Sequence, residues 1–445
     1  NNHKTQNINM KTSETFQEFL FNIKIQEDKA NTISYRYGRI TKSLNEYFRN
    51  TDSKTANSLQ VGSYGRYSGI KGISDLDMLY IMPSSKWDTY NKNGGQSQLL
   101  ADTKTAISNT YSASDIRVDR CVVTVKFSDG THIDVQPVFE IEDKDYKYPD
   151  TYNDGSWKVT KPRKEMDAMV ESSQNFNRNL RRLCKMARSW KMKSGVVMSG
   201  LLIDTLAYNF LNSTSYYDEK SYSYYDEMSR DFFKYLFDQP KDQKEYGALG
   251  SKQRVKVRKP FKRKAKKAYD LACEAIDATS EKTQHNKWRD IYGKDFPKYR
   301  YEENEAKAIN MSYHNTEEFI EDLYPINILF DLEIECDIKQ DGFREGTLRY
   351  YLSQKFPLLP GKKLHFYIKS NPVPFPYEVK WKVTNRGEEA IRKDCIRGQI
   401  VADNGNEIRV ESTNFRGEHF VECYIIKDGI VVAKDSIDVP ISTNS

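Results

Sequence analysis

The sequence lacks any apolar run long enough to cross a membrane. A membrane-spanning helix needs roughly 18 or more consecutive apolar residues, and the nearest approach, residues 195–211, contains Asp204 and Asn209. The polar segment Asn1–Met10 holds no apolar signal region. We therefore expect a cytoplasmic protein with no membrane partner.

Cysteine is scarce and scattered. The six cysteines form no Cys-x-x-Cys pair and no cluster with histidine, which argues against a zinc site and fits free thiols in a reducing compartment. The net charge of +6 is modest and does not by itself indicate a nucleic-acid partner. With 445 residues, 30% of them charged and 13% aromatic, the composition is typical of a globular protein with two or three domains.

The first two regions of the chain differ in their hydrophobic pattern. Residues 11–165 begin with helical periodicity over Thr15–Arg49, as one long helix or two consecutive ones, and continue with short strands. Residues 166–324 are mainly helical, and the clearest patterns cover Asn175–Lys193 and Ser199–Leu211. The sequence thus predicts a strand-rich lobe followed by a helical lobe.

The third region, residues 325–445, has clustered prolines and alternating strand-like runs. Two of these runs are joined by Lys427-Asp428-Gly429, a hairpin signal. We expect this region to form a small all-β sandwich, and the whole chain to have an α+β fold.

The most informative motif is Gly62-Ser63, separated by eleven residues from Asp75-Leu76-Asp77. Because strand residues alternate between the two faces, Asp75 and Asp77 point the same way. Glycine lets the backbone approach a phosphate, and Ser63 adds an N–H and a hydroxyl at a helix start. We predict that Gly62 and Ser63 bind the phosphates of a nucleotide.

A third carboxylate, Asp134, lies early in a predicted strand over residues 132–139, the antiparallel partner of residues 119–127. Mg²⁺ prefers carboxylate oxygens, and two such ions roughly 3.5–4 Å apart stabilise both the attacking and the leaving oxygen of a phosphoryl transfer. We predict that Asp75, Asp77 and Asp134 hold Mg²⁺, or Mn²⁺ in its place, and catalyse nucleotidyl transfer.

The acids of the first motif also suit a simpler interpretation, as solvent-facing charges on an edge strand. A second alternating run, residues 331–337, provides an internal control because it has no Gly-Ser turn upstream. We interpret that second run as a polar sheet face. The turn, the spacing and the later acid favour the catalytic interpretation for the first run.

Two motifs resemble a known superfamily. Gly-Ser-Tyr-Gly-Arg-Tyr before Asp75-Leu-Asp77, with Ile133-Asp134-Val135, resembles the polymerase-β-like nucleotidyltransferases, and within them the cGAS/DncV-like enzymes of bacteria. The helical stretch Arg178–Lys191, followed by Ser199-Gly-Leu-Leu, is similar to the second lobe shared with oligoadenylate synthases. The resemblance implies a sheet lobe and a helical lobe with ATP or GTP between them.

The end of the chain resembles a second known family. Trp381-Lys-Val-Thr-Asn-Arg-Gly, Ile396-Arg-Gly and Gly417–Gly429 are similar to the adenylyl/guanylyl and SMODS C-terminal sensor domain. Together the two resemblances imply a synthase that joins ATP, GTP or both into a cyclic di- or trinucleotide with release of pyrophosphate. They also imply a role in bacterial anti-phage signalling of the CBASS type, with a downstream effector reached through the product.

The resemblance adds two residues of the helical lobe to the nucleotide-binding set. Lys185 matches the family position that contacts donor phosphates, and Ser199 matches a serine that hydrogen-bonds phosphate. The simpler alternatives are a solvated charge for Lys185 and a helix N-cap for Ser199.

A basic run, Lys252–Lys267, carries ten Lys or Arg in sixteen positions. Such a run invites a nucleic-acid hypothesis, but its second half enters a helical pattern, where a solvated helix face is the default. A nucleic-acid partner is therefore not favoured. Two alternatives to the cyclic-nucleotide synthase stay open: transfer of nucleotides to RNA or protein, and a non-catalytic sensor that only binds nucleotides.

Overall fold

The computed structural model describes residues 2–299 and most of the chain beyond residue 317. The described residues after 317 are 318, 320–324, 326–339, 346–354, 356, 358, 361–386, 398–412 and 417–441. Pro325, Cys395 and Ile396, which were part of the sequence interpretation, lie outside them.

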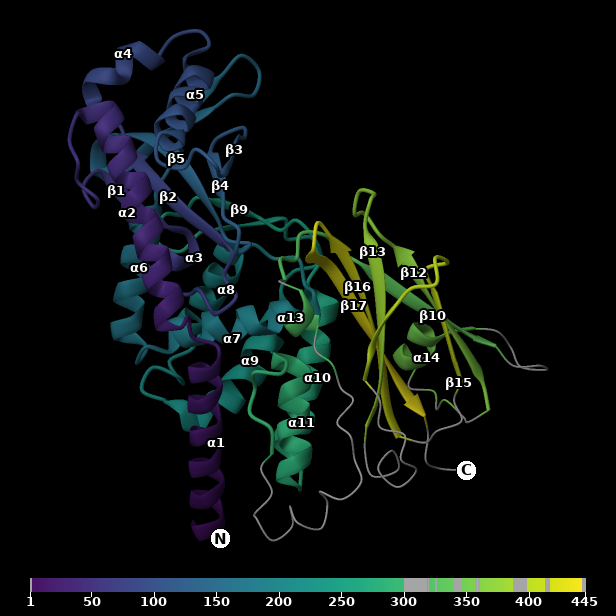
Figure 1. The fold of residues 1–445 in the computed structure, drawn as a ribbon. Coiled ribbons are helices and arrows are strands. Elements are labelled where there is room, and N and C mark those ends of the chain that lie inside the picture. Colours follow the sequence, from purple (N-terminus) through teal and green to yellow (C-terminus); the bar gives the residue numbers. More distant parts are fainter. Residues whose placement is uncertain are drawn as a thin grey trace. The chain divides into compact units, whose positions relative to one another are not determined.

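The chain divides into two compact units (Figure 1). The first unit comprises residues 1–189, 198–258 and 265–276, and the second comprises residues 190–197, 259–264 and 277–445. The proposed division of the chain into domains at residues 165 and 324 stays a prediction.

A seven-stranded mixed sheet lies within residues 58–160, all of which are described. Its strands are β1 (Ser58–Val61), β2 (Asp75–Ile81), β3 (Asp115–Val118), β4 (Val123–Lys126), β5 (His132–Glu140), β6 (Tyr146–Asp150) and β7 (Ser156–Thr160). Their order is β1-β2-β5-β4-β3, and β6 and β7 extend the sheet from β5. β4 pairs antiparallel with β5, as predicted, whereas β2 pairs parallel with β5.

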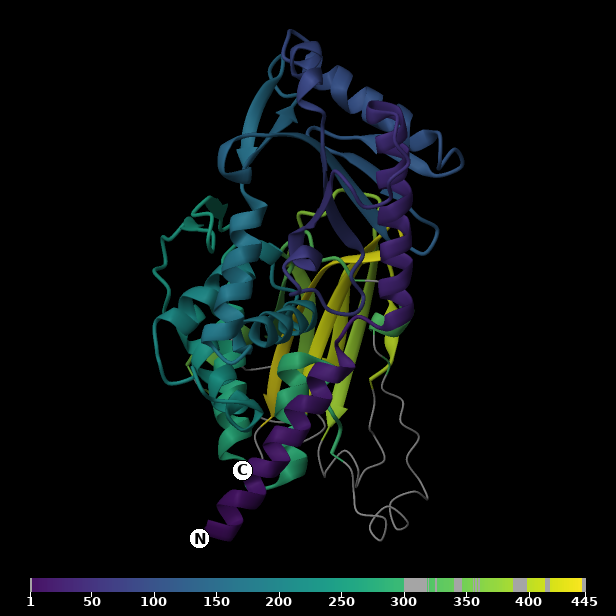
Figure 2. The ribbon, with the colours of Figure 1, turned by 90° about the vertical axis from the view of Figure 1, so that its left-hand side faces the viewer.

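Two helices cover one face of this sheet, α2 (Glu27–Arg49) and α5 (Gly95–Ser108) (Figures 1 and 2). α2 presents apolar residues every three or four positions, the spacing of one helix face. The core between helices and sheet includes Ile33, Ile40, Leu44, Leu76, Met78, Leu99 and Ile133. Leu79 and Val138 lie in a smaller core with Tyr146. Apolar packing thus fixes β2 and β5 beside each other.

The remaining elements of the first unit are mostly helical. They are α1 (Asn2–Asn22), α3 (Gly62–Gly65), α4 (Trp87–Tyr90), α6 (Pro162–Asn175), α7 (Asn179–Ser194), α8 (Gly200–Asn212), α9 (Tyr225–Asp238), α10 (Lys262–Asp277), the 3₁₀ turns η1 (Ser84–Lys86), η2 (Glu142–Lys144) and η3 (Tyr222–Tyr224), and the strands β8 (Glu245–Gly247) and β9 (Arg254–Lys256). The last residues of α7 and the first of α10 belong to the second unit. The N-terminal periodicity left two alternatives, one long helix or two consecutive helices. The second is confirmed, because α1 and α2 are separate helices.

The described residues of the second unit form two four-stranded antiparallel sheets, ordered β11-β10-β12-β15 and β14-β13-β16-β17. The strands are β10 (Glu333–Lys339), β11 (Gly346–Thr347), β12 (Lys363–Ser370), β13 (Glu378–Arg386), β14 (Ile400–Ala402), β15 (Ile408–Ser412), β16 (Gly417–Lys427) and β17 (Ile430–Ile441). Residues from both sheets share one core, among them Cys336, Phe366, Trp381 and Cys423. The expected α+β fold with a C-terminal sandwich is confirmed.

Short helices accompany these sheets: α11 (Glu281–Tyr292), α13 (Ile320–Leu323) and α14 (Leu348–Ser353). Sequence reasoning missed α5 and β6 in the first unit. α5 buries the polar residues Gln96 and Thr103, which blur its apolar stripe, and Pro149 stands inside β6. Among the described residues, no helix has both the length and the apolarity that a membrane span requires.

Candidate active site

The parallel pairing of β2 with β5 places two predicted catalytic acids side by side. Asp77 lies opposite Asp134 in this pairing, and Asp75 lies opposite His132. The Asp134 carboxylate accepts a hydrogen bond of 2.5 Å from the hydroxyl of Thr124 on β4. The hydroxyl of Tyr37 on α2 donates to the backbone oxygen of Asp77 at 2.9 Å. The Asp134 carboxylate is therefore held by β4, and the backbone at Asp77 is held by α2.

The Gly-Ser turn packs directly against this pair of acids. Gly62 begins the one-turn helix α3 and has a φ of +65°. A Cβ added at Gly62 would lie 2.0 Å from Oδ2 of Asp77, so any other residue here would have to displace that carboxylate. The backbone oxygen of Ser63 accepts N–H bonds from Ser68 and Gly69, at 3.0 and 3.1 Å, which close the loop that follows. The predicted turn and the predicted acids thus form one local structure.

Asp77 is electrostatically strained when no cation is bound. Burial, and then the neighbouring charge of Asp134, raise its pKa to about 6, while Arg66 opposes the rise. Two carboxylates of this kind offer hard oxygen ligands and an excess of negative charge, which a divalent cation relieves. The donor chemistry at Asp77 and Asp134 therefore fits Mg²⁺.

Asp75 is arranged differently from the other two acids. Its Oδ1 lies 3.3 Å from Nε2 of His132 and accepts a bond of 2.7 Å from the hydroxyl of Ser74. In the described part of the chain, no three His, Cys, Asp or Glu side chains are arranged to hold a metal ion as they stand. Metal binding by all three carboxylates consequently stays a prediction. Asp77 and Asp134 are adjacent, whereas Asp75 contacts His132.

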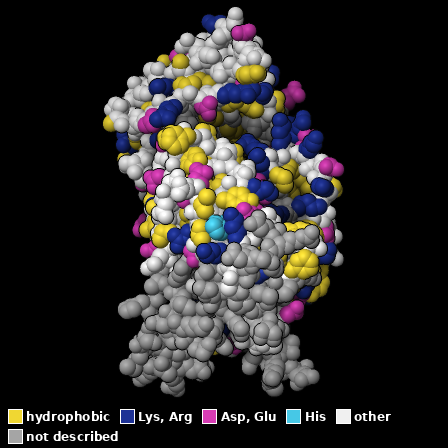
Figure 3. Space-filling view, turned by 90° about the vertical axis from the view of Figure 1, so that its right-hand side faces the viewer, with side chains coloured by type: hydrophobic (Ala, Val, Ile, Leu, Met, Phe, Trp, Pro, Cys, Tyr) yellow, Lys and Arg dark blue, Asp and Glu magenta, His cyan; other side chains and the backbone are white. Residues whose placement is uncertain are grey.

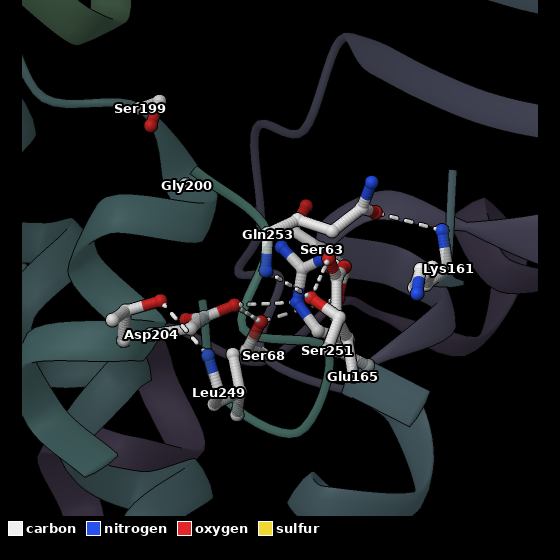
Figure 4. A network of polar contacts seen from close by, with 12 residues as sticks. Ser63, Ser68, Lys161, Glu165, Ser199, Gly200, Asp204, Leu249, Ser251 and Gln253 are labelled. Atoms are coloured by element: carbon white, nitrogen blue, oxygen red, sulfur yellow. Dashed lines mark hydrogen bonds and ion pairs between the residues drawn. The ribbon is translucent and has the colours of Figure 1, made fainter. Parts of the chain in front are cut away.

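A buried ion-pair network, missed by sequence reasoning, ties the Gly-Ser segment to the helical lobe (Figure 4). Asp204 on α8 is fully buried and accepts hydrogen bonds from Arg66 Nε at 2.8 Å and Ser68 Oγ at 2.9 Å. Arg188 on α7 donates to both oxygens of Asp204, at 2.5 and 3.0 Å. Although burial alone would raise it, Arg188 and Arg66 hold the pKa of Asp204 below its usual range.

The network continues into the loop before β9. Arg66 Nη1 lies 3.5 Å from Glu165 on α6, which also accepts a 3.0 Å bond from Ser251. Ser251 in turn accepts the backbone N–H of Gln253 at 3.3 Å (Figure 4). Because a buried charge must be paired, the network fixes the segment after Gly62 relative to α6, α7 and α8. The isolated Asp204 in an apolar run was the available sequence signal.

The two predicted helical-lobe ligands have local roles that are visible in the structure. Ser199, next to Gly200 in Figure 4, caps α8, since its hydroxyl accepts the N–H of Leu202 at 3.2 Å. Burial, together with the nearby charge of Arg181, lowers the pKa of Lys185 on α7. Capping matches the alternative interpretation of Ser199, and contact of either residue with phosphate stays a prediction.

The basic run of residues 252–267 is not a continuous solvated surface. Lys264 is buried, donates to the backbone oxygen of Gly195 at 2.8 Å and lies 3.9 Å from Asp435. Lys266 is paired with Asp270 one helical turn along α10. Across the face in Figure 3, Lys and Arg side chains lie among acidic and apolar ones. These pairings leave less free charge for a nucleic acid than the sequence count suggested.

Facing acids on parallel strands, a Gly-Ser turn against them and an adjoining helical lobe define the nucleotidyltransferase class. Residues 10–173 match the Second Messenger Oligonucleotide or Dinucleotide Synthetase domain, and residues 314–442 match the Adenylyl/Guanylyl and SMODS C-terminal sensor domain. The chain thus carries a nucleotidyltransferase domain of the second-messenger synthetase kind, followed by this C-terminal sensor domain. No curated protein matches it in sequence.

Solved structures of bacterial enzymes are similar to part of this chain. CdnC of E. coli MS115-1, in complex with HORMA-deltaN, is 16% identical to this chain with a TM-score of 0.50. The match covers 64% of this chain and 98% of the CdnC chain. CdnG of Bradyrhizobium diazoefficiens in complex with GTP is 11% identical, with a TM-score of 0.47 and coverages of 63% and 96%. Vibrio cholerae DncV, a cyclic AMP-GMP synthase, is 15% identical, with a TM-score of 0.45 and coverages of 67% and 92%. At 16% identity, the likeness to CdnC concerns the fold alone.

Proposed function

We propose that this enzyme joins ATP, GTP or both into a cyclic di- or trinucleotide and releases pyrophosphate. The observation that carries the proposal is the parallel register of β2 and β5, which brings Asp77 beside Asp134 directly against Gly62. The matching synthetase domain supports an oligonucleotide or dinucleotide product. ATP and GTP are proposed as substrates because relatives were solved with ATP and with GTP.

The proposed chemistry assigns a role to each site residue. Asp77 and Asp134, joined by Asp75, would hold Mg²⁺ or Mn²⁺. The bound ions would offset charge on the attacking hydroxyl and on the leaving pyrophosphate. Gly62 leaves room for the Asp77 carboxylate against the turn, and Ser63 would offer its N–H and hydroxyl to a phosphate. Thr124 holds the Asp134 carboxylate from β4, and Tyr37 holds the backbone at Asp77 from α2.

The helical lobe contributes the phosphate contacts of the proposal. Lys185 would balance triphosphate charge, and Ser199 would add a hydroxyl contact in addition to its capping bond. The Asp204 network keeps Arg66, four residues after Gly62, in a fixed position relative to α7, which carries Lys185. Substrate positioning of this kind lowers the barrier by holding the reacting groups in one geometry.

The biological role in the proposal is anti-phage signalling of the CBASS type in the cytoplasm. It rests on the family, whose members with this sensor domain accompany prokaryotic defence systems. The product would act on a downstream effector. The second unit would regulate the reaction without supplying chemistry, because described acids in it, such as Glu333 and Asp435, are paired with Lys369 and Arg349.

One experiment separates the proposal from its alternatives. Purified protein is incubated with labelled ATP and GTP and Mg²⁺ or Mn²⁺, and the products are treated with phosphatase. A small phosphatase-resistant product supports cyclisation. Labelled RNA or labelled protein would instead assign the enzyme to transfer onto a macromolecule, and nucleotide binding without turnover would assign it a sensor role.

A further inference from the structure

Two facing pairs of side chains lie on one face of the β2–β5 strand pair. Asp77 lies opposite Asp134, and two positions earlier on both strands Asp75 lies opposite His132. Because strand residues two positions apart share a face, all four side chains lie on the same side of the sheet. The proposed metal site uses the three acids of this group and leaves His132 without a role.

Asp75 is the acid of this group that most needs support from a neighbour. The exposed fraction of its side chain is 48%. An exposed carboxylate loses rotamer freedom when it becomes a ligand, and this loss weakens binding unless other groups have already fixed the side chain. A cation held by Asp77 and Asp134 therefore gains Asp75 most readily if a neighbour keeps that side chain on the shared face.

Two neighbouring groups hold the Asp75 carboxylate through one of its oxygens. Nε2 of His132 lies 3.3 Å from Oδ1, and the hydroxyl of Ser74 donates to the same oxygen at 2.7 Å. These contacts restrict the orientation of the carboxylate and keep it beside His132, on the face that it shares with the other two acids. Carboxylates that bind a metal are commonly held in this way by hydrogen bonds from outside the ligand set.

The backbone of His132 is itself fixed at this point. Its N–H donates to the backbone oxygen of Ser74 at 2.8 Å, so His132 is tied to the residue that precedes Asp75. On its other side His132 pairs with Lys126 of β4. A side chain on a strand between two paired strands positions its partner more precisely than a side chain on a loop.

The turn just before His132 is anchored to α2. The Asp129 carboxylate accepts bonds from Lys29 at 3.2 Å and from Arg36 at 3.0 and 3.1 Å. It also accepts the N–H of Thr131 at 3.1 Å. Although burial alone would raise it, these bonds lower the pKa of Asp129 to about 2. The start of β5, and His132 with it, is therefore held from α2 as well as from β2.

A second histidine of the chain also lies opposite an acid, but in a different setting. His365 on β12 pairs with Asp337 on β10 in the second unit. The pair two positions along these strands is Glu335 with Tyr367, not two acids. His365 therefore has the strand environment of His132 without a pair of acids beside it, which makes it a matched control.

We propose that His132 is a positioning residue of the metal site. Through its contact with Oδ1, it holds Asp75 in the orientation in which this carboxylate joins the other two acids as a ligand of the divalent cation. The proposal rests on the proposed function and adds one residue to its metal site. Loss of a partner that holds a ligating carboxylate typically weakens metal binding by about 10- to 100-fold.

The test measures binding of Mn²⁺ to the full chain without nucleotide, from the electron paramagnetic resonance signal of the free ion. His132→Phe keeps a planar ring but loses the donor, and it should weaken Mn²⁺ binding at least about 10-fold. His132→Gln, whose amide N–H can replace that of Nε2, should recover most of the loss. His365→Phe should match wild type, and circular dichroism should show an unchanged fold in each variant.

A second comparison separates positioning of Asp75 from a general effect on the fold. His132→Phe should change the Mn²⁺ affinity no further when Asp75→Asn is already present, because His132 acts through Asp75. Unchanged or tighter Mn²⁺ binding in His132→Phe would overturn the proposal. A further loss of the same size in the Asp75→Asn background would also overturn it.

Product formation from ATP and GTP, measured on the same variants, tests the proposed function separately. Product from wild type, together with unchanged Mn²⁺ affinity in His132→Phe, would overturn the positioning role and leave the proposed function standing. Mn²⁺ binding that depends on His132, in a wild type that forms no product, would support the positioning role and refute the proposed function.

Discussion

Two strands of this molecule carry the same alternation of acids and apolar residues but meet different neighbours. On β2, Asp77 faces another acid, Asp134, across a parallel pairing. On β10, Glu333 pairs with Lys369 at 2.9 Å, and Glu335 accepts backbone N–H bonds from Cys336 and Arg349 at 3.0 and 3.2 Å. Both strands bury their alternate apolar residues in a core.

The difference shows that an acidic pattern acquires chemistry from its neighbours. Glu333 is matched by a cation and Glu335 by N–H donors, so these two acids of β10 stabilise the fold. Asp77 is matched by a like charge and by a glycine without a side chain, and its pKa rises. Negative charge that the fold leaves unneutralised is what a cation and a phosphate turn require.

The largest expected effect comes from removing one of the facing acids. Asp134→Asn should lower turnover about 10³-fold, the scale seen when a group that stabilises transition-state charge is lost. Asp337→Asn on β10 is the matched control and should leave turnover unchanged. Product formation under saturating nucleotide measures both. Equal activities of the two variants would remove the distinction between the strands.

The next largest effect concerns the glycine beside Asp77. Gly62→Ala places a methyl group 2.0 Å from Oδ2 of Asp77, which must move the carboxylate. A displacement of about 1 Å can cost about 10²-fold in rate. Gly94→Ala is the control, because Gly94 also has a positive φ, +71°, but nothing lies within 4 Å of its Cβ position. Steady-state rates that fall alike in both variants would point to backbone strain alone.

Stability should respond to pH through Asp77. Because the folded pKa, about 6, lies above the ordinary value of 3.8, the native state binds more protons between these values, and stability falls as pH rises through this window. In EDTA, Asp77→Asn should therefore be more stable than wild type at pH 7, by about 1–3 kcal/mol. The two should converge near pH 4. Urea unfolding at several pH values checks this, and a variant less stable at pH 7 would contradict it.

The smallest effect is expected on β10, where removing a charge should lower stability instead of raising it as Asp77→Asn should. Glu335→Gln keeps an acceptor oxygen but removes the charge that strengthens its two N–H bonds, so it should lower stability by about 1 kcal/mol. Turnover should stay at the wild-type level. Urea unfolding at pH 7 measures the change. A stabilised Glu335→Gln would mean that β10 carries excess negative charge like β2.

The sequence was sufficient for local features of the site and insufficient for those made by distant residues. The Gly-Ser turn, the strand with Asp75 and Asp77, and the hairpin that carries Asp134 depend on short-range patterns. The parallel register of β2 with β5 does not, because it joins residues more than fifty positions apart. The Arg66–Asp204 bond spans 138 positions and had no local signal beyond one acid in an apolar helix.

Charge counting alone misled in the basic run. Lys264 reads as part of a solvated helix face but is buried against Gly195, Asp331 and Asp435. A buried lysine is stable only with such partners, and those partners lie on other elements of the second unit. Helical periodicity places a residue on a face but does not say what covers that face.

The most direct test of the central claim is product formation by the double variant Asp77→Asn/Asp134→Asn beside wild type. Both are incubated with labelled ATP, GTP and Mg²⁺, and folding is verified by circular dichroism. We expect a phosphatase-resistant product from wild type and none from the folded double variant. Substantial product from the double variant would contradict the claim that nucleotidyl transfer takes place where these two strands bring their acids together.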